Sequence, residues 1–167
     1  MKSNVVKIVG GMVLAVLVIS TLTLGLVSAQ DETKSQNGGG GRLEGTWDAQ
    51  VTIRNCQTGG AIRTFPAIGT FTSGGTMLNS DSGTPQALKT PGHGVWGHIS
   101  GNTYRFKFKS FSFDASGSFT GWTIINHEAS LNSTADAYDS AGTAEVYAPN
   151  GNLIFTGCST TTATRFE

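Results

Sequence analysis

Charged residues are scarce in this sequence, and neither sign dominates. Only 13% of the 167 residues are charged, with eleven basic and eleven acidic residues. Two of the basic residues, Lys2 and Lys7, belong to a predicted signal peptide, so the exported chain keeps nine against eleven, a net charge of −2. Because nucleic acids and acidic membrane surfaces attract basic proteins, this balance favours neither of them as a partner.

Helical periodicity and catalytic or metal-binding motifs are also missing. Beyond residue 42 the apolar residues do not recur with a helical period. The three histidines, His93, His98 and His127, are not spaced as HxH or HxxxH, spacings that place two metal ligands on one face. His127 and Glu128 would point to opposite faces of a strand, and no nucleophile elbow is present. We therefore predict no catalytic residues, no metal and no cofactor.

Cysteine occurs only twice, and the one long apolar run lies at the N-terminus. Residues 1–29 combine two lysines, this run and small residues before Gln30, which is the pattern of a cleaved signal peptide. The run approaches the length of a membrane span, so an uncleaved N-terminal anchor is the alternative. We expect a membrane as a partner only in that case. A secreted or periplasmic location is oxidising, so we expect a disulfide between Cys56 and Cys158. Two free cysteines are the other possibility.

The remaining chain divides into a linker and one domain. Residues 30–42 are polar and glycine-rich, which predicts a flexible linker. Residues 43–167 have the length of a single domain with one core. Short runs rich in aromatic and β-branched residues alternate there with turn residues, as in an all-β sandwich or barrel. Eight strands are expected, at residues 45–54, 61–72, 76–79, 94–100, 103–113, 119–131, 137–148 and 152–166.

Short turns join these strands, which predicts an antiparallel up-and-down β-barrel closed by pairing of the first strand with the last. A single alignment of these two strands brings together both the two cysteines and the Trp47/Arg165 pair. We expect Cys56 to lie opposite Cys158. This alignment puts Trp47 opposite Glu167 and diagonal to Arg165, within reach of the arginine side chain.

The turns and the alternation of side chains predict which residues face inward. The inward set is Val95, Gly97, Ile99, Tyr104, Phe106, Phe108, Val146, Ala148, Leu153, Phe155, Ser159, Thr161 and Ala163. The outward set around the turn at Gly101-Asn102 is Trp96, His98, Arg105, Lys107 and Lys109. A change in the aromatic phase predicts a bulge near Lys109-Ser110. The phase of residues 119–131 stays open, because Trp122 and Asn126 compete with His127 for the inside.

An eight-stranded barrel is either filled by side chains or holds one small ligand. The predicted interior mixes large rings with small or polar residues, which favours a cavity with apolar walls and a few hydrogen-bonding groups. The expected ligand-binding wall consists of Tyr104, Phe106, Phe108, Trp122, Asn126, Phe155, Ser159 and Thr161. The long connection at residues 80–93 is interpreted either as a lid over the mouth or as an ordinary surface loop.

Two resemblances add to this interpretation. Gly45-Thr46-Trp47 together with Arg165 resembles the Trp/Arg signature of the calycin superfamily, which includes lipocalins, fatty-acid-binding proteins and avidins. This resemblance implies that the arginine packs across the tryptophan at the closed end of a barrel. A second set of segments resembles a family of uncharacterised secreted bacterial proteins, from which no activity carries over. These segments are RNCQTG (54–59), FTSGGTM (71–77), PGHGVW (91–96), FDASG (113–117) and the ending at 156–166.

The function expected from these features is binding of a small, mainly apolar molecule inside an exported, calycin-like barrel. Fold does not imply function, so two alternatives stay open. One is an enzyme that uses the cavity, such as a cyclase, and an inward Tyr104 or His127 is its candidate group. The other is a structural or interaction protein with a filled barrel.

Overall fold

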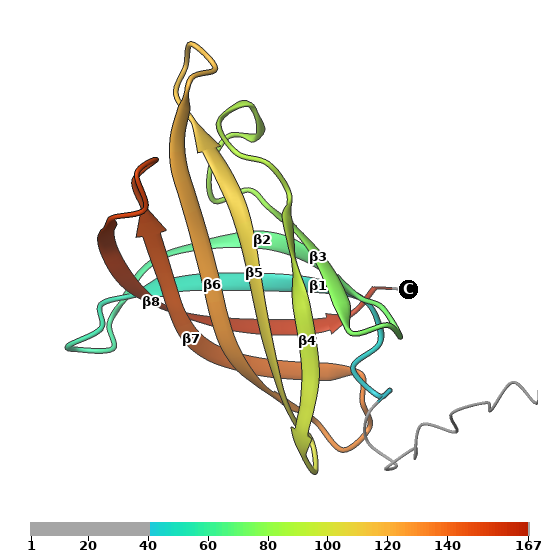
Figure 1. The fold of residues 1–167 in the computed structure, drawn as a ribbon. Coiled ribbons are helices and arrows are strands. Elements are labelled where there is room, and N and C mark those ends of the chain that lie inside the picture. The colour runs from blue at the N-terminus through green and yellow to red at the C-terminus, as the bar shows by residue number, and fades with distance from the viewer. Residues whose placement is uncertain (1–40, 167) are drawn as a thin grey trace, which may run out of the picture. The chain divides into compact units, whose positions relative to one another are not determined.

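The structure is a computed structural model that describes residues 41–166, which form a closed antiparallel barrel (Figure 1). Its strands are β1 (Gly45–Arg54), β2 (Ala61–Phe71), β3 (Thr76–Asp81), β4 (Gly92–Ser100), β5 (Thr103–Phe113), β6 (Phe119–Leu131), β7 (Ala137–Tyr147) and β8 (Leu153–Arg165). A short 3-10 turn, η1 (Gln86–Leu88), lies between β3 and β4. The strands follow one another in chain order, and β8 pairs with β1. The predicted eight-stranded up-and-down barrel is therefore confirmed.

The predicted signal peptide at residues 1–29 and most of the predicted linker lie outside the described residues. Within residues 41–166 no helix is long and apolar enough to cross a membrane. Arg42, the last residue of the predicted linker, is hydrogen-bonded to the barrel. Its guanidinium donates to Oδ1 of Asn102 at 2.8 Å and to the carbonyl of Ser133 at 2.7 Å.

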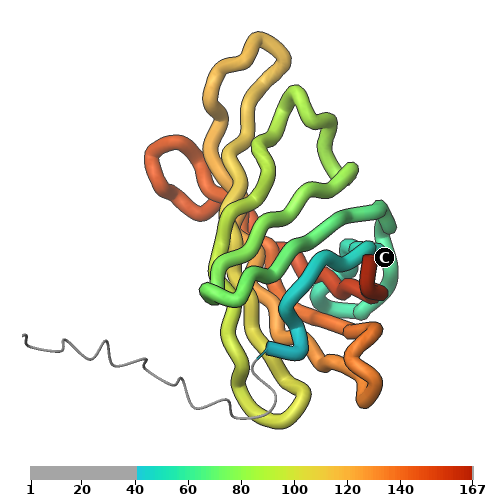
Figure 2. Tube along the Cα trace, turned by 90° about the vertical axis from the view of Figure 1, so that its right-hand side faces the viewer, coloured from blue at the N-terminus to red at the C-terminus, as the bar shows by residue number. Residues whose placement is uncertain are grey.

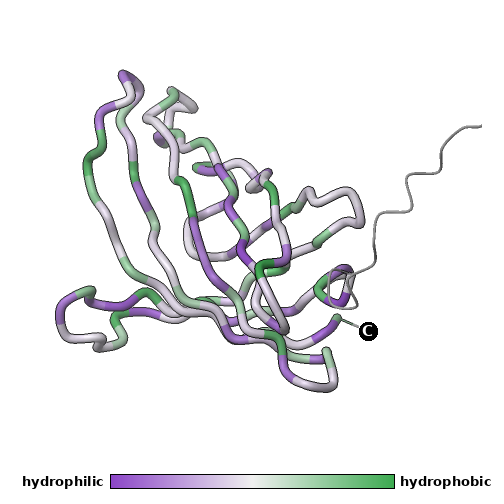
Figure 3. Tube along the Cα trace, turned by 60° about the horizontal axis from the view of Figure 1, so that its bottom comes forward, coloured by the Kyte–Doolittle hydropathy of each residue, from purple (hydrophilic) through white to green (hydrophobic). Residues whose placement is uncertain are grey.

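Strand β5 shows why these segments form half-buried strands. Its inward side chains, Tyr104, Phe106 and Phe108, are all buried. The side chains between and beyond them, Arg105, Lys107 and Lys109, are exposed. A period of two separates an apolar face from a polar face only when the backbone is extended. Figure 3 shows the result, with hydrophobic and hydrophilic residues interspersed along the strands.

The barrel has two different ends. The closed end holds the residues just before β1 and the turns after β2, β4 and β6. The mouth holds the turns after β1, β5 and β7 and the long loop between β3 and β4. In Figures 1 and 2 the β5–β6 hairpin and the β3–β4 loop lie at the top, side by side.

The seam between β1 and β8 differs by two residues from the predicted alignment. Trp47 lies directly opposite Arg165, and Arg54 lies opposite Cys158. Cys56 is beyond the strand because the chain turns at Asn55, whose Oδ1 accepts hydrogen bonds from the next backbone N–H groups. The predicted disulfide nevertheless forms from this turn, with 5.2 Å between the Cα atoms of Cys56 and Cys158.

The closed end is locked by Arg165 and Trp47. The guanidinium carbon lies 4.5 Å from the centre of the indole ring, and the indole is completely buried. Its Nε1 donates a hydrogen bond of 2.9 Å to the carbonyl of Leu43. The guanidinium also donates to the backbone carbonyls of Arg42 (2.6 Å), Glu44 (2.8 Å) and Ala135 (2.7 Å). This is the packing that the calycin resemblance implies.

The predicted faces of β4 were wrong. Trp96 lies opposite Phe106 and His98 opposite Tyr104, so both face inward and are half-buried. Val95, predicted inside, is 60% exposed on the outer face. The cause is a register shift between His98 and Ser100, which adds one residue to β4 beside the turn and reverses the faces.

The predicted bulge near Lys109-Ser110 is also absent. β5 pairs regularly with β6 through this region and shifts register only between Ser112 and Phe113. Ser110 is buried inside, while Phe111 lies outside. The ammonium of Lys109 lies over the rings of Phe111 and Trp122 at 5.1 and 4.1 Å, which covers part of these outward aromatics.

Replacement of Arg165 by lysine tests the lock at the closed end. Arg165→Lys keeps the positive charge but loses the planar guanidinium. A lysine ammonium cannot donate to all three backbone carbonyls and stack on the Trp47 ring at the same time. We expect the free energy of unfolding to fall by about 2–4 kcal/mol, since a hydrogen bond to a charged group is worth about 1.5–3 kcal/mol. Urea unfolding followed by tryptophan fluorescence measures this. Arg105→Lys, the same exchange at an exposed position of β5, is the control, and equal losses in both variants would contradict the lock.

Candidate functional site

A partly enclosed cavity of about 80 Å³ lies inside the barrel, between the closed end and the mouth. Its apolar wall includes Val51, Ile53, Phe65, Phe71, Met77, Phe106, Phe108 and Ile125. One buried water needs about 10–15 Å³, and an apolar cavity of about 150 Å³ holds a benzene molecule. The interior therefore has room for several waters or for part of a small molecule, and it is not completely filled.

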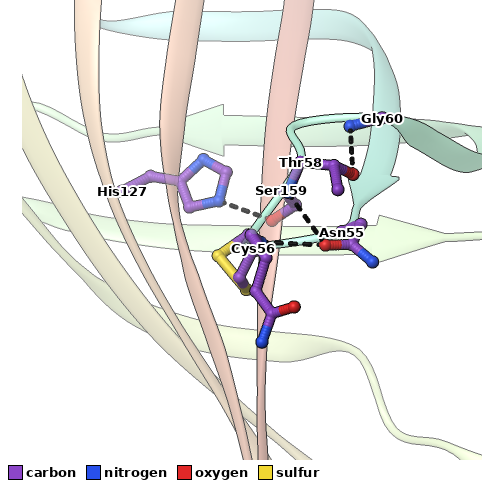
Figure 4. The surroundings of a disulfide bond; sticks show 8 residues. Asn55, Cys56, Thr58, Gly60, His127 and Ser159 are labelled. Carbon is purple, nitrogen blue, oxygen red and sulfur yellow. Dashed lines mark hydrogen bonds between the residues drawn. A yellow bond between two sulfur atoms is a disulfide. The ribbon is translucent and has the colours of Figure 1, made fainter.

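One polar cluster interrupts the apolar wall. His127 on β6 is 4% exposed, and its ring contacts two serines, one on the adjacent strand and one on the strand beyond it. Its Nδ1 is 2.9 Å from Oγ of Ser140 on β7, and its Nε2 is 2.8 Å from Oγ of Ser159 on β8. Figure 4 shows the ring pointing at Ser159, the residue after the disulfide-bonded Cys158. We call Ser140, His127 and Ser159 the His–Ser relay.

Neighbouring strands set the position of the His127 ring. Phe106 on β5 lies directly opposite His127 and faces inward, and paired residues of an antiparallel ladder share a face. On the other side His127 pairs with Gly142. A Cβ atom at Gly142 would lie 2.0 Å from the carbonyl oxygen of Asn126 and 2.6 Å from Cδ2 of the ring. The absence of a side chain at this position therefore gives the imidazole its space.

Burial controls the charge of the relay. Removal from water lowers the pKa of His127 to about 4, so the ring is neutral near pH 7. A neutral imidazole has one N–H donor and one nitrogen acceptor. One serine hydroxyl of the relay therefore donates to the ring, and the other accepts from it.

The remaining titratable groups of the cavity are Tyr138 and Asp81. Burial raises the pKa of Tyr138, so its phenol stays protonated. Asp81 lies at the end of β3 that faces the mouth and makes an ion pair of 2.6 Å with Lys89. Among the described residues that line the cavity, none is a lysine or an arginine. The wall is thus apolar, with neutral hydrogen-bonding groups inside and a carboxylate near the entrance.

Five of the eight predicted wall residues face the interior. Phe106, Phe108, Ser159 and Thr161 line the cavity. Tyr104 is fully buried but packs at the closed end, with its ring centre 5.0 Å from that of His98 and 6.1 Å from that of Trp96.

The other three predicted wall residues lie elsewhere. Trp122 and Asn126 are on the outer face of β6, because the pairing of Phe106 with His127 brings the opposite set of side chains inside. Phe155 is 59% exposed. The pairing of β1 with β8 ends at Arg54 and Cys158, so the first residues of β8 have no β1 residues beside them. Leu153, also predicted inside, is exposed after a register shift between Val146 and Tyr147.

The long loop between β3 and β4 lies at the mouth and is attached on two sides. Arg63 of β2 donates to the carbonyl of Gly83, and Gly83 packs against the ring of Phe65 in the cavity wall. On the other side Thr90 exchanges two hydrogen bonds of 3.0 Å with the backbone of Phe111 on β5. The loop therefore fills the space between β2 and β5 at the mouth, beside the cavity.

The sequence named an inward His127 only as the candidate group of an enzyme, and its hydrogen bonds to two serines were not predicted. The sequence left the phase of β6 open, and Ser140 was not singled out. Small residues on the neighbouring strands, Gly142, Ser140 and Ser159, could have indicated a buried histidine. They are recognisable as its neighbours only once the strand register is known. No group of three or more His, Cys, Asp or Glu residues within residues 41–166 is placed to hold a metal ion. A search against known protein families and curated proteins finds no match for this chain.

The buried imidazole predicts a loss of stability in acid. The ring takes up a proton near pH 6.5 in the unfolded chain and near pH 4 in the folded one, so between these values the unfolded state binds more protons. Stability contributed by the neutral ring is complete above pH 6.5 and falls as the pH drops towards 4. The loss amounts to about 3 kcal/mol across this window. Urea unfolding at a series of pH values measures it.

Two variants separate this effect from the titration of surface groups. His127→Gln keeps a hydrogen-bonding side chain but removes the titrating ring, so the fall in stability with pH should become shallower. His93→Gln makes the same exchange at an exposed position of β4 and should keep the wild-type slope. A wild-type slope in the His127 variant would show that another group carries the pH dependence.

Proposed function

We propose that this protein is an exported, calycin-like barrel that binds a small, mainly apolar molecule in its interior. The observation that carries the proposal is the partly enclosed apolar cavity with two members of the His–Ser relay, His127 and Ser159, on its wall. A ligand pocket combines an apolar wall with a few polar groups that orient the ligand. The stacking of Arg165 on Trp47 at the closed end supports the likeness to calycins.

Export is supported by the chemistry of the chain. The predicted signal peptide at residues 1–29 precedes a domain whose two cysteines are bonded to each other. Disulfides persist in secreted and periplasmic proteins because these compartments are oxidising. The bound molecule is thus one that is present outside the cytoplasm.

The cavity volume limits the size of the ligand. About 80 Å³ accommodates only a few non-hydrogen atoms, so a longer ligand extends past Asp81 towards the loop at the mouth. Apolar contact supplies about 0.8 kcal/mol for each buried CH₂ group. Affinity should therefore increase with chain length only while the added groups enter the cavity.

An enzyme is the second candidate function, and the contact of 2.8 Å between Nε2 of His127 and Oγ of Ser159 favours it. In the tautomer with an unprotonated Nε2, the ring is a base within reach of a hydroxyl on the cavity wall. Tyr104, the other catalytic candidate, is at the closed end and not on this wall.

A series of primary alcohols from propanol to octanol tests binding. We expect NMR shifts at the amides of His127 and Ser159, with affinity rising about fourfold per CH₂ and then levelling off when the cavity is full. Val51→Phe places a ring in the cavity wall and should weaken binding at least tenfold. Val95→Phe, the same exchange on the outer face, is the control. Shifts that are confined to other surfaces would contradict the proposal.

Hydrolysis of p-nitrophenyl acetate tests the enzyme. If Ser159 is a nucleophile activated by His127, the wild type releases nitrophenol with turnover, and Ser159→Ala reduces the rate to that of the buffer. Ser130→Ala, on the exposed face of β6, leaves the rate unchanged. Binding of alcohols without any turnover by the wild type would eliminate a hydrolytic role for this serine.

A further inference from the structure

We infer that the ligand meets the His–Ser relay with an uncharged hydroxyl or carbonyl group, and that the site discriminates against carboxylates. This inference rests on the proposed function and names the chemical class of the ligand's polar group. Three features carry it: the bonding capacity of the relay, the charges around the cavity and the position of the aromatic wall.

The relay leaves one serine hydroxyl accessible to a ligand. Both ring nitrogens of His127 are engaged, one with each serine. Ser159 lines the cavity, whereas Ser140 is buried and is not part of the cavity wall. A ligand in the cavity therefore reaches the relay through Oγ of Ser159.

The hydroxyl of Ser159 offers a donor or an acceptor, depending on which nitrogen of the ring carries the proton. When Nε2 is protonated, it donates to Ser159, and the serine O–H is free to donate to a carbonyl or hydroxyl oxygen of the ligand. When Nδ1 is protonated, Ser159 donates to Nε2 and keeps lone pairs for a hydroxyl of the ligand. A change of the His127 tautomer thus lets Ser159 bind either a carbonyl or a hydroxyl group of the ligand.

The charges around the cavity oppose an anion. The described residues of the cavity wall include no lysine or arginine, and His127 is neutral near pH 7. Asp81 places a carboxylate near the mouth, and the nearby Lys89 is already paired with it. Another cation at the mouth is Arg63, which lies 5.0 Å from the centre of the Phe65 ring and donates to the carbonyl of Gly83. A carboxylate beside Ser159 would lose its hydration without gaining a counterion from the cavity wall, which is much more costly than burying a neutral hydroxyl.

The aromatic wall places the apolar part of the ligand beside the relay. The ring centre of Phe106 lies 5.4 Å from that of His127, and Phe108 stacks at 6.4 Å from Phe106 on the same side. A compact apolar body against these rings brings one polar substituent to Ser159. The ligand class is therefore a small alcohol, ketone or aldehyde.

Four probes of one ring size test the inference on the intact, oxidised protein: cyclopentane, cyclopentanol, cyclopentanone and cyclopentanecarboxylate, titrated near pH 7.5 by NMR. We expect cyclopentanol and cyclopentanone to bind severalfold more tightly than cyclopentane. Cyclopentanecarboxylate should bind at least tenfold more weakly than cyclopentanol. A carboxylate that binds as tightly as the alcohol would overturn the inference and leave the proposed function standing, whereas failure of all four probes would overturn both.

Variants of Ser159 locate the preference. Ser159→Ala should remove the advantage of cyclopentanol over cyclopentane while cyclopentane still binds. Ser159→Thr restores the hydroxyl and should restore the advantage. Ser130→Ala, the matched exchange on the outer face, should leave all affinities unchanged. If cyclopentanol keeps its advantage in the alanine variant, the relay does not hold the polar group and the inference fails.

Discussion

The barrel depends on the seam where β1 meets β8, and the guanidinium of Arg165 holds one end of this seam. Its flat fork stacks on Trp47 and bonds the carbonyls of Arg42, Glu44 and Ala135. These carbonyls belong to the segment before β1 and to the turn before β7. The side chain of Arg165 therefore connects both of these segments to β8. The disulfide between Cys56 and Cys158 lies at the other end of the seam. A crosslink between residues 102 apart contributes about 4–5 kcal/mol through chain entropy.

Closure of the seam creates the environment of the candidate site. A closed sheet has no exposed edges, and its interior is removed from water. This removal keeps His127 neutral and makes its hydrogen bonds to Ser140 and Ser159 necessary, because a buried polar group without a partner destabilises the fold. The chemistry of the relay is therefore a consequence of the architecture and not of a local motif.

Large buried side chains gather at the closed end, and the cavity lies between this end and the mouth. The largest completely buried side chains, among them Trp47 and Tyr104, pack at the closed end. Beyond this packing, small inward residues such as Ala49 and Ser159 leave the space that forms the cavity. Changes of side-chain volume near the mouth therefore alter the cavity while the packing at the closed end is retained.

The sequence alone determined the eight strands, their order, the disulfide and the faces of β5 up to Lys109, because alternation of residue types along a strand is local and strong there. Only the tertiary structure decided the register of the seam, the faces of β4 and the faces of β6. The chain turns at Asn55 before Cys56 pairs, one extra residue beside the turn at Gly101 reverses β4, and both faces of β6 carry apolar residues. The side-chain period of a strand is two, so a shift of one residue exchanges inside and outside, and such shifts depend on turns and cross-strand partners. This is why the relay at His127 became apparent only from the paired strands.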